Sequence, residues 1–108
     1  MNGDYIELAG PASEADIVET LVELLQPAGV TRSETSFPLL SLDEHNFLFV
    51  DVDPDRPWPT LLAIGNVDND DQTRQTTAKS IFHALECATS MPMRWTSDIS
   101  PEIITHTD

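Results

Sequence analysis

The stretch Asn46-Phe47-Leu48-Phe49-Val50-Asp51-Val52 decides the fold of this chain. Phe47 and Phe49 share one side of an extended backbone, whereas Leu48, Val50 and Val52 share the other side. Apolar side chains on both sides are typical of a central strand. Residues 60–67 repeat this two-sided pattern, so we expect two neighbouring inner strands joined by the loop 53–59.

Three further strands and two helices are predicted outside this pair. Residues 5–9 alternate in polarity and predict a short strand, residues 30–36 predict an exposed edge strand, and residues 93–97 predict a last strand. Apolar residues recur at helical spacing from Glu14 to Leu25 or Gln26, after an N-cap at Ser13. A second helix is expected from Gln72 to Ala88 or Thr89, with Asp70 or Asp71 as its N-cap. Its expected buried stripe consists of Ala78, Ile81, Phe82, Leu85 and Ala88.

This order of elements predicts an α+β fold. We expect two helices packed on one face of a mostly antiparallel sheet of about five strands, because two helices cannot cover both faces. A ferredoxin-like plait is the preferred topology. Residues 1–100 should form a single acidic domain and residues 101–108 a loose C-terminal tail.

The chain is strongly acidic. Nineteen acidic and five basic residues give a formal net charge of −14 on 108 residues. Such an excess serves solubility, a salty environment, or attraction to a basic partner. Five basic residues in separate segments cannot form a surface that binds phosphates, so we expect no contact with nucleic acid.

The remaining composition favours a soluble protein. The N-terminal residues show no secretory signal, and no apolar run is long enough for a membrane span, so we expect a cytoplasmic location without membrane contact. Cys87 is the only cysteine, which excludes an internal disulfide and a zinc site of several cysteines.

Two groups of residues are candidates for a chemical site. Asp51, Asp53 and Asp55 could share a cation, but Arg56 stands where an EF-hand has its turn glycine, and capping of the turn is the favoured interpretation. His83 and Cys87 lie four residues apart on a helix, as a thiolate–imidazolium dyad or half a metal site would require. The chain lacks the positive charge that activates a thiol, and it shows no oxyanion loop. We therefore predict no catalytic residue, metal or cofactor, and lean against an enzyme.

The loop 53–59 is the strongest candidate for binding. It contains three prolines, which hold Trp58 away from a regular strand. Trp and Arg are enriched among residues that dominate binding energies, and Arg56 is two positions away. Either Trp58 anchors a partner, or it folds back as a lid over one end of the sheet. The predicted binding residues are Trp58, Arg56, Asp51, Asp53 and Asp55.

These observations favour a small protein–protein interaction module that binds a basic partner protein. Its sharpest form is an inhibitor or immunity-type protein whose carboxylates imitate a phosphate backbone. The alternative is a domain that binds a small molecule or a metal, or an enzyme without a recognisable motif. The exposed edge near residues 31–36 could also join two copies as a homodimer.

Overall fold

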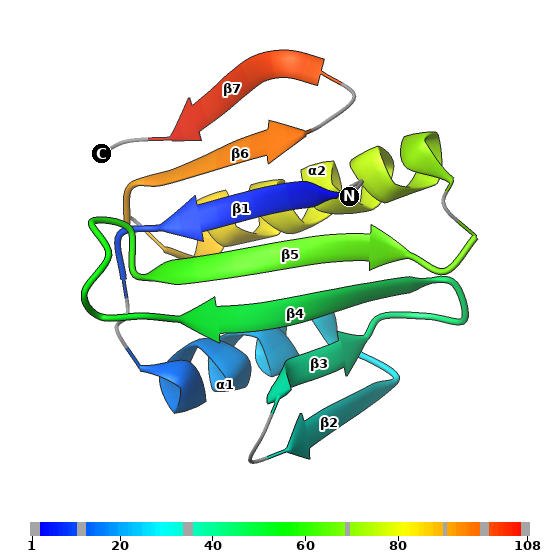
Figure 1. Ribbon diagram of the computed structural model, residues 1–108, viewed down its shortest axis with the longest axis horizontal. Coiled ribbons are helices and arrows are strands. Elements are labelled where there is room, and N and C mark those ends of the chain that lie inside the picture. Colours follow the sequence, from blue (N-terminus) through cyan, green and yellow to red (C-terminus); the bar gives the residue numbers. More distant parts are fainter. Residues whose placement is uncertain are drawn as a thin grey trace.

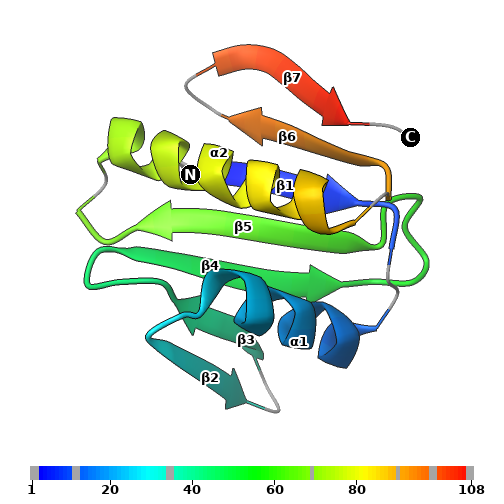
Figure 2. The same cartoon turned by 180° about the vertical axis from the view of Figure 1, so that it is seen from behind.

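Two helices lie on one face of a single seven-stranded sheet (Figures 1 and 2). This computed structural model describes residues 3–10, 13–33, 36–68, 70–89, 91–97 and 100–106. All strand pairs are antiparallel, and both helices lie on the same face of the sheet (Figures 1 and 2). The predicted α+β class is therefore confirmed. The elements are, in chain order, β1 (Asp4–Leu8), α1 (Glu14–Leu25), β2 (Gly29–Ser33), β3 (Ser36–Ser41), β4 (Asn46–Val52), β5 (Thr60–Asn66), α2 (Asp71–Ala88), β6 (Met93–Ser97) and β7 (Ser100–His106).

The sheet order is β2-β3-β4-β5-β1-β6-β7, which places β4 and β5 in the interior as predicted. The ferredoxin-like plait is not confirmed, because the sheet has two more strands than expected and a different order. β2, the strand after α1, is separated from β1 by the three strands β3, β4 and β5, whereas a split βαβ unit has one strand between its two parallel strands. Only β5, α2 and β6 keep the split arrangement of that fold, since β1 lies between β5 and β6.

Strand β3 was missed because its sequence contains Pro38, which we expected to end the preceding strand. Proline removes a donor from the ladder, and the β3 ladders are indeed incomplete around it. Pairing with β2 shifts register between Thr31 and Ser33, and the described pairs with β4 begin at Leu39. Glu34 and Thr35, which belong to the predicted edge strand, lie outside the described residues.

Strand β7 occupies most of the segment that we predicted to be a loose tail. It pairs with β6 from Met93 opposite His106 to Ser97 opposite Ser100. The expectation of a loose tail was therefore wrong for residues 101–106, where Ile103, Ile104 and Thr105 have the β-branched side chains that favour strands. Residues 107 and 108 lie outside the described part.

Both helices begin at the predicted caps. The Ser13 side chain accepts a hydrogen bond from the Asp16 backbone N–H, and the Asp70 side chain accepts one from the Thr73 backbone N–H. α1 ends at Leu25, and its C-cap residue Gln26 has a left-handed φ of 47°. The hydrophobic core lies between the sheet and these helices. Its buried side chains include Ile6, Leu8, Ile17, Val18, Leu21, Leu48, Val50, Leu62, Ile64, Ala78, Ile81, Phe82 and Leu85.

A buried ion pair joins α2 to the sheet and was not predicted. Arg74 Nε donates to Asp4 Oδ1 at 2.9 Å, and both side chains are almost fully buried. Asp4 also accepts hydrogen bonds from Trp95 Nε1 at 3.0 Å and Ser97 Oγ at 2.9 Å. The buried stripe of α2 thus begins with Arg74, whereas Ala88, which we expected to be buried, is exposed.

Candidate interaction face

No helix or strand in the described part of the chain covers the sheet face opposite α1 and α2 (Figure 1). We call it the open face, and its side chains alternate with those of the core along each strand. One row crosses four strands through Leu39, Phe49, Ala63 and Tyr5. None of these side chains is fully buried, and Phe49 is 37 % exposed. The open face consists of Tyr5, Glu7, Leu39, Ser41, Phe47, Phe49, Asp51, Leu61, Ala63, Gly65, Arg94 and Thr96.

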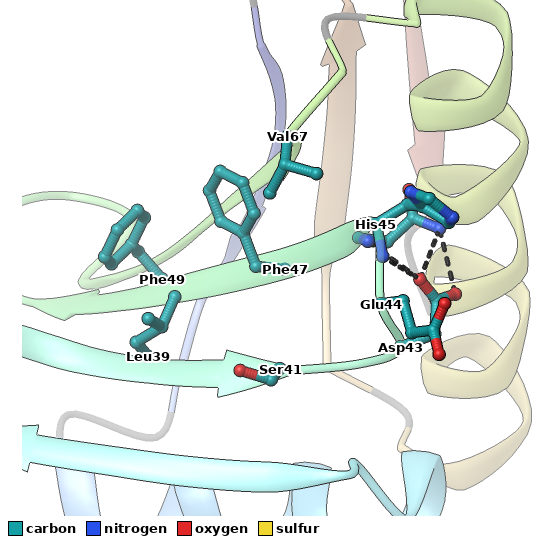
Figure 3. Close-up of a pocket in the computed structure, with 9 residues that line it drawn as sticks. Leu39, Ser41, Asp43, Glu44, His45, Phe47, Phe49 and Val67 are labelled. Carbon is teal, nitrogen blue, oxygen red and sulfur yellow. Dashed lines mark hydrogen bonds between the residues drawn. The ribbon is translucent and has the colours of Figure 1, made fainter.

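A hollow of about 330 Å³ lies on this face beside β3 and β4 (Figure 3). Leu39, Phe47, Phe49 and Val67 form its apolar side. The two phenylalanine rings meet edge to face, with centroids 5.5 Å apart. The turn between β3 and β4 closes the other side with polar groups. The lining residues are Leu39, Ser41, Asp43, Glu44, His45, Asn46, Phe47, Phe49 and Val67.

Gly65 determines where the Phe47 ring lies. The two residues are opposite each other in the β4–β5 ladder. A Cβ atom on Gly65 would lie 2.5 Å from Phe47 Cζ, which is closer than van der Waals contact allows. The ring therefore lies directly over the glycine, a close approach that only a residue without a side chain permits.

Hydrogen bonds fix the polar end of the hollow. Asp43 Oδ1 accepts from the backbone N–H of His45 at 2.7 Å and from that of Asn46 at 2.8 Å. Asn46 Nδ2 also donates to Asp43 Oδ2 at 2.9 Å. The hydrogen bond from the Asn46 side chain and those from the two backbone N–H groups lower the pKa of Asp43 below its usual value of 3.8. Asp43 is therefore held as a carboxylate.

The same network brings the β5–α2 turn against the β3–β4 turn. Asn66 Nδ2 donates to Asn46 Oδ1 at 2.9 Å, and the Val67 backbone N–H donates to the His45 carbonyl at 2.8 Å. His45 Nδ1 lies 2.8 Å from Asp68 Oδ2. We call Asp43, Glu44 and Asp68 the acidic rim. In the described part of the chain, no lysine or arginine lines the hollow.

The predicted binding loop lies at the opposite end of β4 from the hollow. Arg56 Nη1 lies 3.2 Å from Asp51 Oδ2, and Nη2 donates to the carbonyls of Asp51 and Pro59. Asp53 Oδ1 accepts from the Asp55 backbone N–H at 3.0 Å. These contacts bring four of the five predicted residues together, and they stabilise the loop itself.

Trp58, the fifth predicted residue, packs on the open face. Its ring lies over the Arg94 guanidinium, whose central carbon is 4.8 Å from the ring centroid. Arg94 in turn donates two hydrogen bonds to the Glu7 carboxylate at 2.9 and 3.1 Å, which raise the pKa of the guanidinium further above its ordinary value. The loop thus folds back over one end of the sheet, and Trp58 remains partly exposed there.

His83 and Cys87, the other candidate chemical groups, do not form a site with the hollow. His83 Nδ1 lies 2.8 Å from Glu86 Oε1, and Cys87 is exposed on the same helix. Among residues that the structure describes, no three His, Cys, Asp or Glu side chains gather as a metal ion would require. Neither described helix is long and apolar enough to cross a membrane. The chain matches no family model, no curated protein and no solved structure.

Proposed function

We propose that this protein is a small acidic interaction module that binds a basic partner protein on its open face. The observation that carries this proposal is an uncovered, aromatic sheet face in a molecule with a net charge of −14. A face of this kind has to be kept from aggregating, and strong like charge does so while leaving the face available to an oppositely charged partner.

The apolar composition of the open face supports binding of protein. Phe and Tyr are enriched at the centres of protein interfaces. Phe47 and Phe49 are both on this face, and Val67 at its border is 59 % exposed. Burying these side chains would contribute about 25 cal/mol for each Å² of apolar surface removed from water.

The distribution of charge supports a basic partner. Arg56, Arg74 and Arg94 each pair with a carboxylate of the same chain, so little of their charge is left to repel cations. The acidic rim lies beside the hollow, and the carboxylates of Asp53 and Asp55 follow the far end of β4. Complementary charge of this kind speeds association and makes it sensitive to salt.

The Trp58 loop provides a second contact on the same face in this proposal. A partner long enough to reach from the hollow to Trp58 would use the predicted binding residues as well as the hollow. An inhibitor or immunity-type protein that occupies the basic surface of a cytoplasmic, nucleic-acid-binding partner remains the sharpest form of the proposal.

The test is an affinity pull-down from extracts of the source cells at low salt, followed by elution along a salt gradient. One basic protein, released in stoichiometric amount at moderate salt, is the expected result. A Trp58→Ala bait run in parallel measures the contribution of the loop. Many basic proteins that all leave at slightly raised salt would show a nonspecific acidic surface and contradict the proposal.

A further inference from the structure

We infer that the hollow binds a segment of the partner in which a large apolar side chain is flanked by lysine or arginine. This inference rests on the proposed function and deepens it, because it states what the partner presents at one place on the open face. The apolar half of the hollow specifies the apolar side chain of the segment, and the acidic half specifies its lysine or arginine.

The apolar half needs an apolar side chain. Leu39, Phe47 and Phe49 offer adjacent carbon surfaces, and Val67 borders them from the β5–α2 turn. A volume of about 330 Å³ is at the lower end of the range of about 300–1,000 Å³ that ligand pockets occupy. The hollow therefore suits one or two side chains of a longer segment better than a whole folded surface.

The acidic half needs a cation next to that apolar side chain. Asp43 and Glu44 line the same hollow as the phenylalanines, and Asp68 is held beside them through His45. Four hydrogen bonds within the turn already occupy the roughly four acceptor sites of the Asp43 carboxylate, so Asp43 contributes negative charge, while the exposed Glu44 offers its carboxylate for direct contact. Carboxylates form their strongest hydrogen bonds with Lys and Arg, and they repel phosphate groups and acidic peptides.

The charge also argues against a second copy as the occupant. In a two-fold dimer the same patch faces itself, so the two acidic rims would be brought to one interface. Like charges at an interface cost several kcal/mol. Since each chain carries a net charge of −14, the whole molecules repel as well.

A peptide selection tests the inference directly. The full-length protein is immobilised and offered short peptides with a fixed central Trp, Phe or Leu and randomised flanking positions. The retained peptides are expected to be enriched in Lys and Arg beside the apolar residue and depleted in Asp and Glu. Tight binders from this selection are then measured by calorimetry against variants of the protein.

Apolar variants with matched exposure locate the binding. Phe49→Ser should weaken the selected peptides at least about tenfold, as expected for a central apolar contact. Val67→Ser should weaken them in the same direction, and its position in an exposed turn makes loss of folding a minor concern. Val22→Ser is the control, because Val22 is 38 % exposed on α1, on the opposite side of the sheet, and should leave the affinity unchanged.

Charge variants test the cationic half. Glu44→Lys with Asp68→Lys should lower the affinity several-fold at low salt and less at high salt. Glu19→Lys with Glu23→Lys makes the same change in net charge on the exposed side of α1 and should have a much smaller effect.

Three results of the peptide experiments would overturn the inference. The first is no enrichment beside the apolar residue, the second is equal loss with Val22→Ser and Phe49→Ser, and the third is equal loss with the two charge-reversal pairs. A basic partner could also bind in stoichiometric amount with an affinity that neither Phe49→Ser nor Val67→Ser changes. That result would overturn this inference and leave the proposed function standing. Failure of the pull-down together with the peptide selection would remove both.

Discussion

At the scale of single residues, Asp4 and Arg74 form a buried ion pair that the sequence pattern does not predict. Both are charged residues that a periodicity argument assigns to the surface, and both are buried. Their positions are 70 residues apart, and only the tertiary structure brings Trp95 and Ser97 to the same carboxylate. Because such a network depends on contacts far apart in sequence, local spacing could not predict it.

Replacing one member of this pair should be costly. Arg74→Ala leaves the buried Asp4 carboxylate without its counter-charge, and removing one partner of a buried ion pair typically costs about 3–5 kcal/mol. Urea denaturation measures this loss. Lys79→Ala, an exposed change on the same helix, should stay within about 0.5 kcal/mol. A loss below about 1 kcal/mol for Arg74→Ala would show that the ion pair contributes little.

The lowered pKa of Asp43 predicts how the free energy of unfolding depends on pH. Its pKa is lowered by folding, so its contribution is fully present above the unfolded value of 3.8 and is lost as the pH falls through the lower, folded value. Asp43→Asn should therefore be less stable than the wild type at neutral pH, and the difference should shrink below about pH 3.8. Denaturation curves at several pH values measure this difference, with Glu19→Gln as an exposed control. A difference that stays constant down to acid pH would contradict the role of Asp43.

At the scale of the elements, strand β4 was predicted correctly and understood only in part. Its bounds and its central position follow from its two-sided apolar pattern. Two helices can cover only one face of the sheet, so apolar residues on both faces of β4 imply one apolar face without helices. Phe47 and Phe49 were the available signal for the hollow, but the sequence does not show which side the helices cover.

The predicted elements fall into two groups for a physical reason. Helices α1 and α2 are local structures whose caps and periodicity can be recognised in sequence, and their bounds agree with the predicted ones to within one residue. Strands β3 and β7 are held by pairing with the strands next to them in the chain, which a single segment's own pattern does not show, and each contains a proline that suggests a break. Pairing with a neighbouring strand outweighs that local signal.

Gly65 offers a way to alter the hollow without unfolding the sheet. Gly65→Ala should displace the Phe47 ring, because the new Cβ would lie 2.5 Å from it. The gain from replacing a strand glycine is about 0.5–1 kcal/mol and should offset part of the strain, so stability should change by less than about 1 kcal/mol. Calorimetry should nevertheless show weaker binding of selected peptides. Unchanged affinity would mean that the position of the Phe47 ring does not matter for binding.

At the scale of the whole molecule, the net charge of −14 determines the long-range electrostatics. Arg56, Arg74 and Arg94 each pair with an acidic residue, and the remaining carboxylates repel one another at low ionic strength. This repulsion opposes folding and also sets the kind of partner that the open face can attract.

Added salt should therefore stabilise the free protein. Raising the salt from about 0.01 to about 1 M shortens the Debye length from about 30 to about 3 Å and screens the repulsion. Each 1 kcal/mol gained would raise Tm by roughly 4–8 °C in a domain of this size. Thermal unfolding monitored by circular dichroism checks this, with sodium chloride as the salt. A Tm that falls with salt would show that attractive pairs outweigh the repulsion.

Chemical-shift mapping tests the use of the open face most directly. The isotope-labelled protein is titrated with the basic partner from the pull-down or with a selected peptide, and the backbone amides are followed by NMR. We expect the largest shifts in β3, β4 and the turn between them, with smaller shifts near Trp58. Shifts confined to the exposed sides of α1 and α2 would contradict binding on the open face.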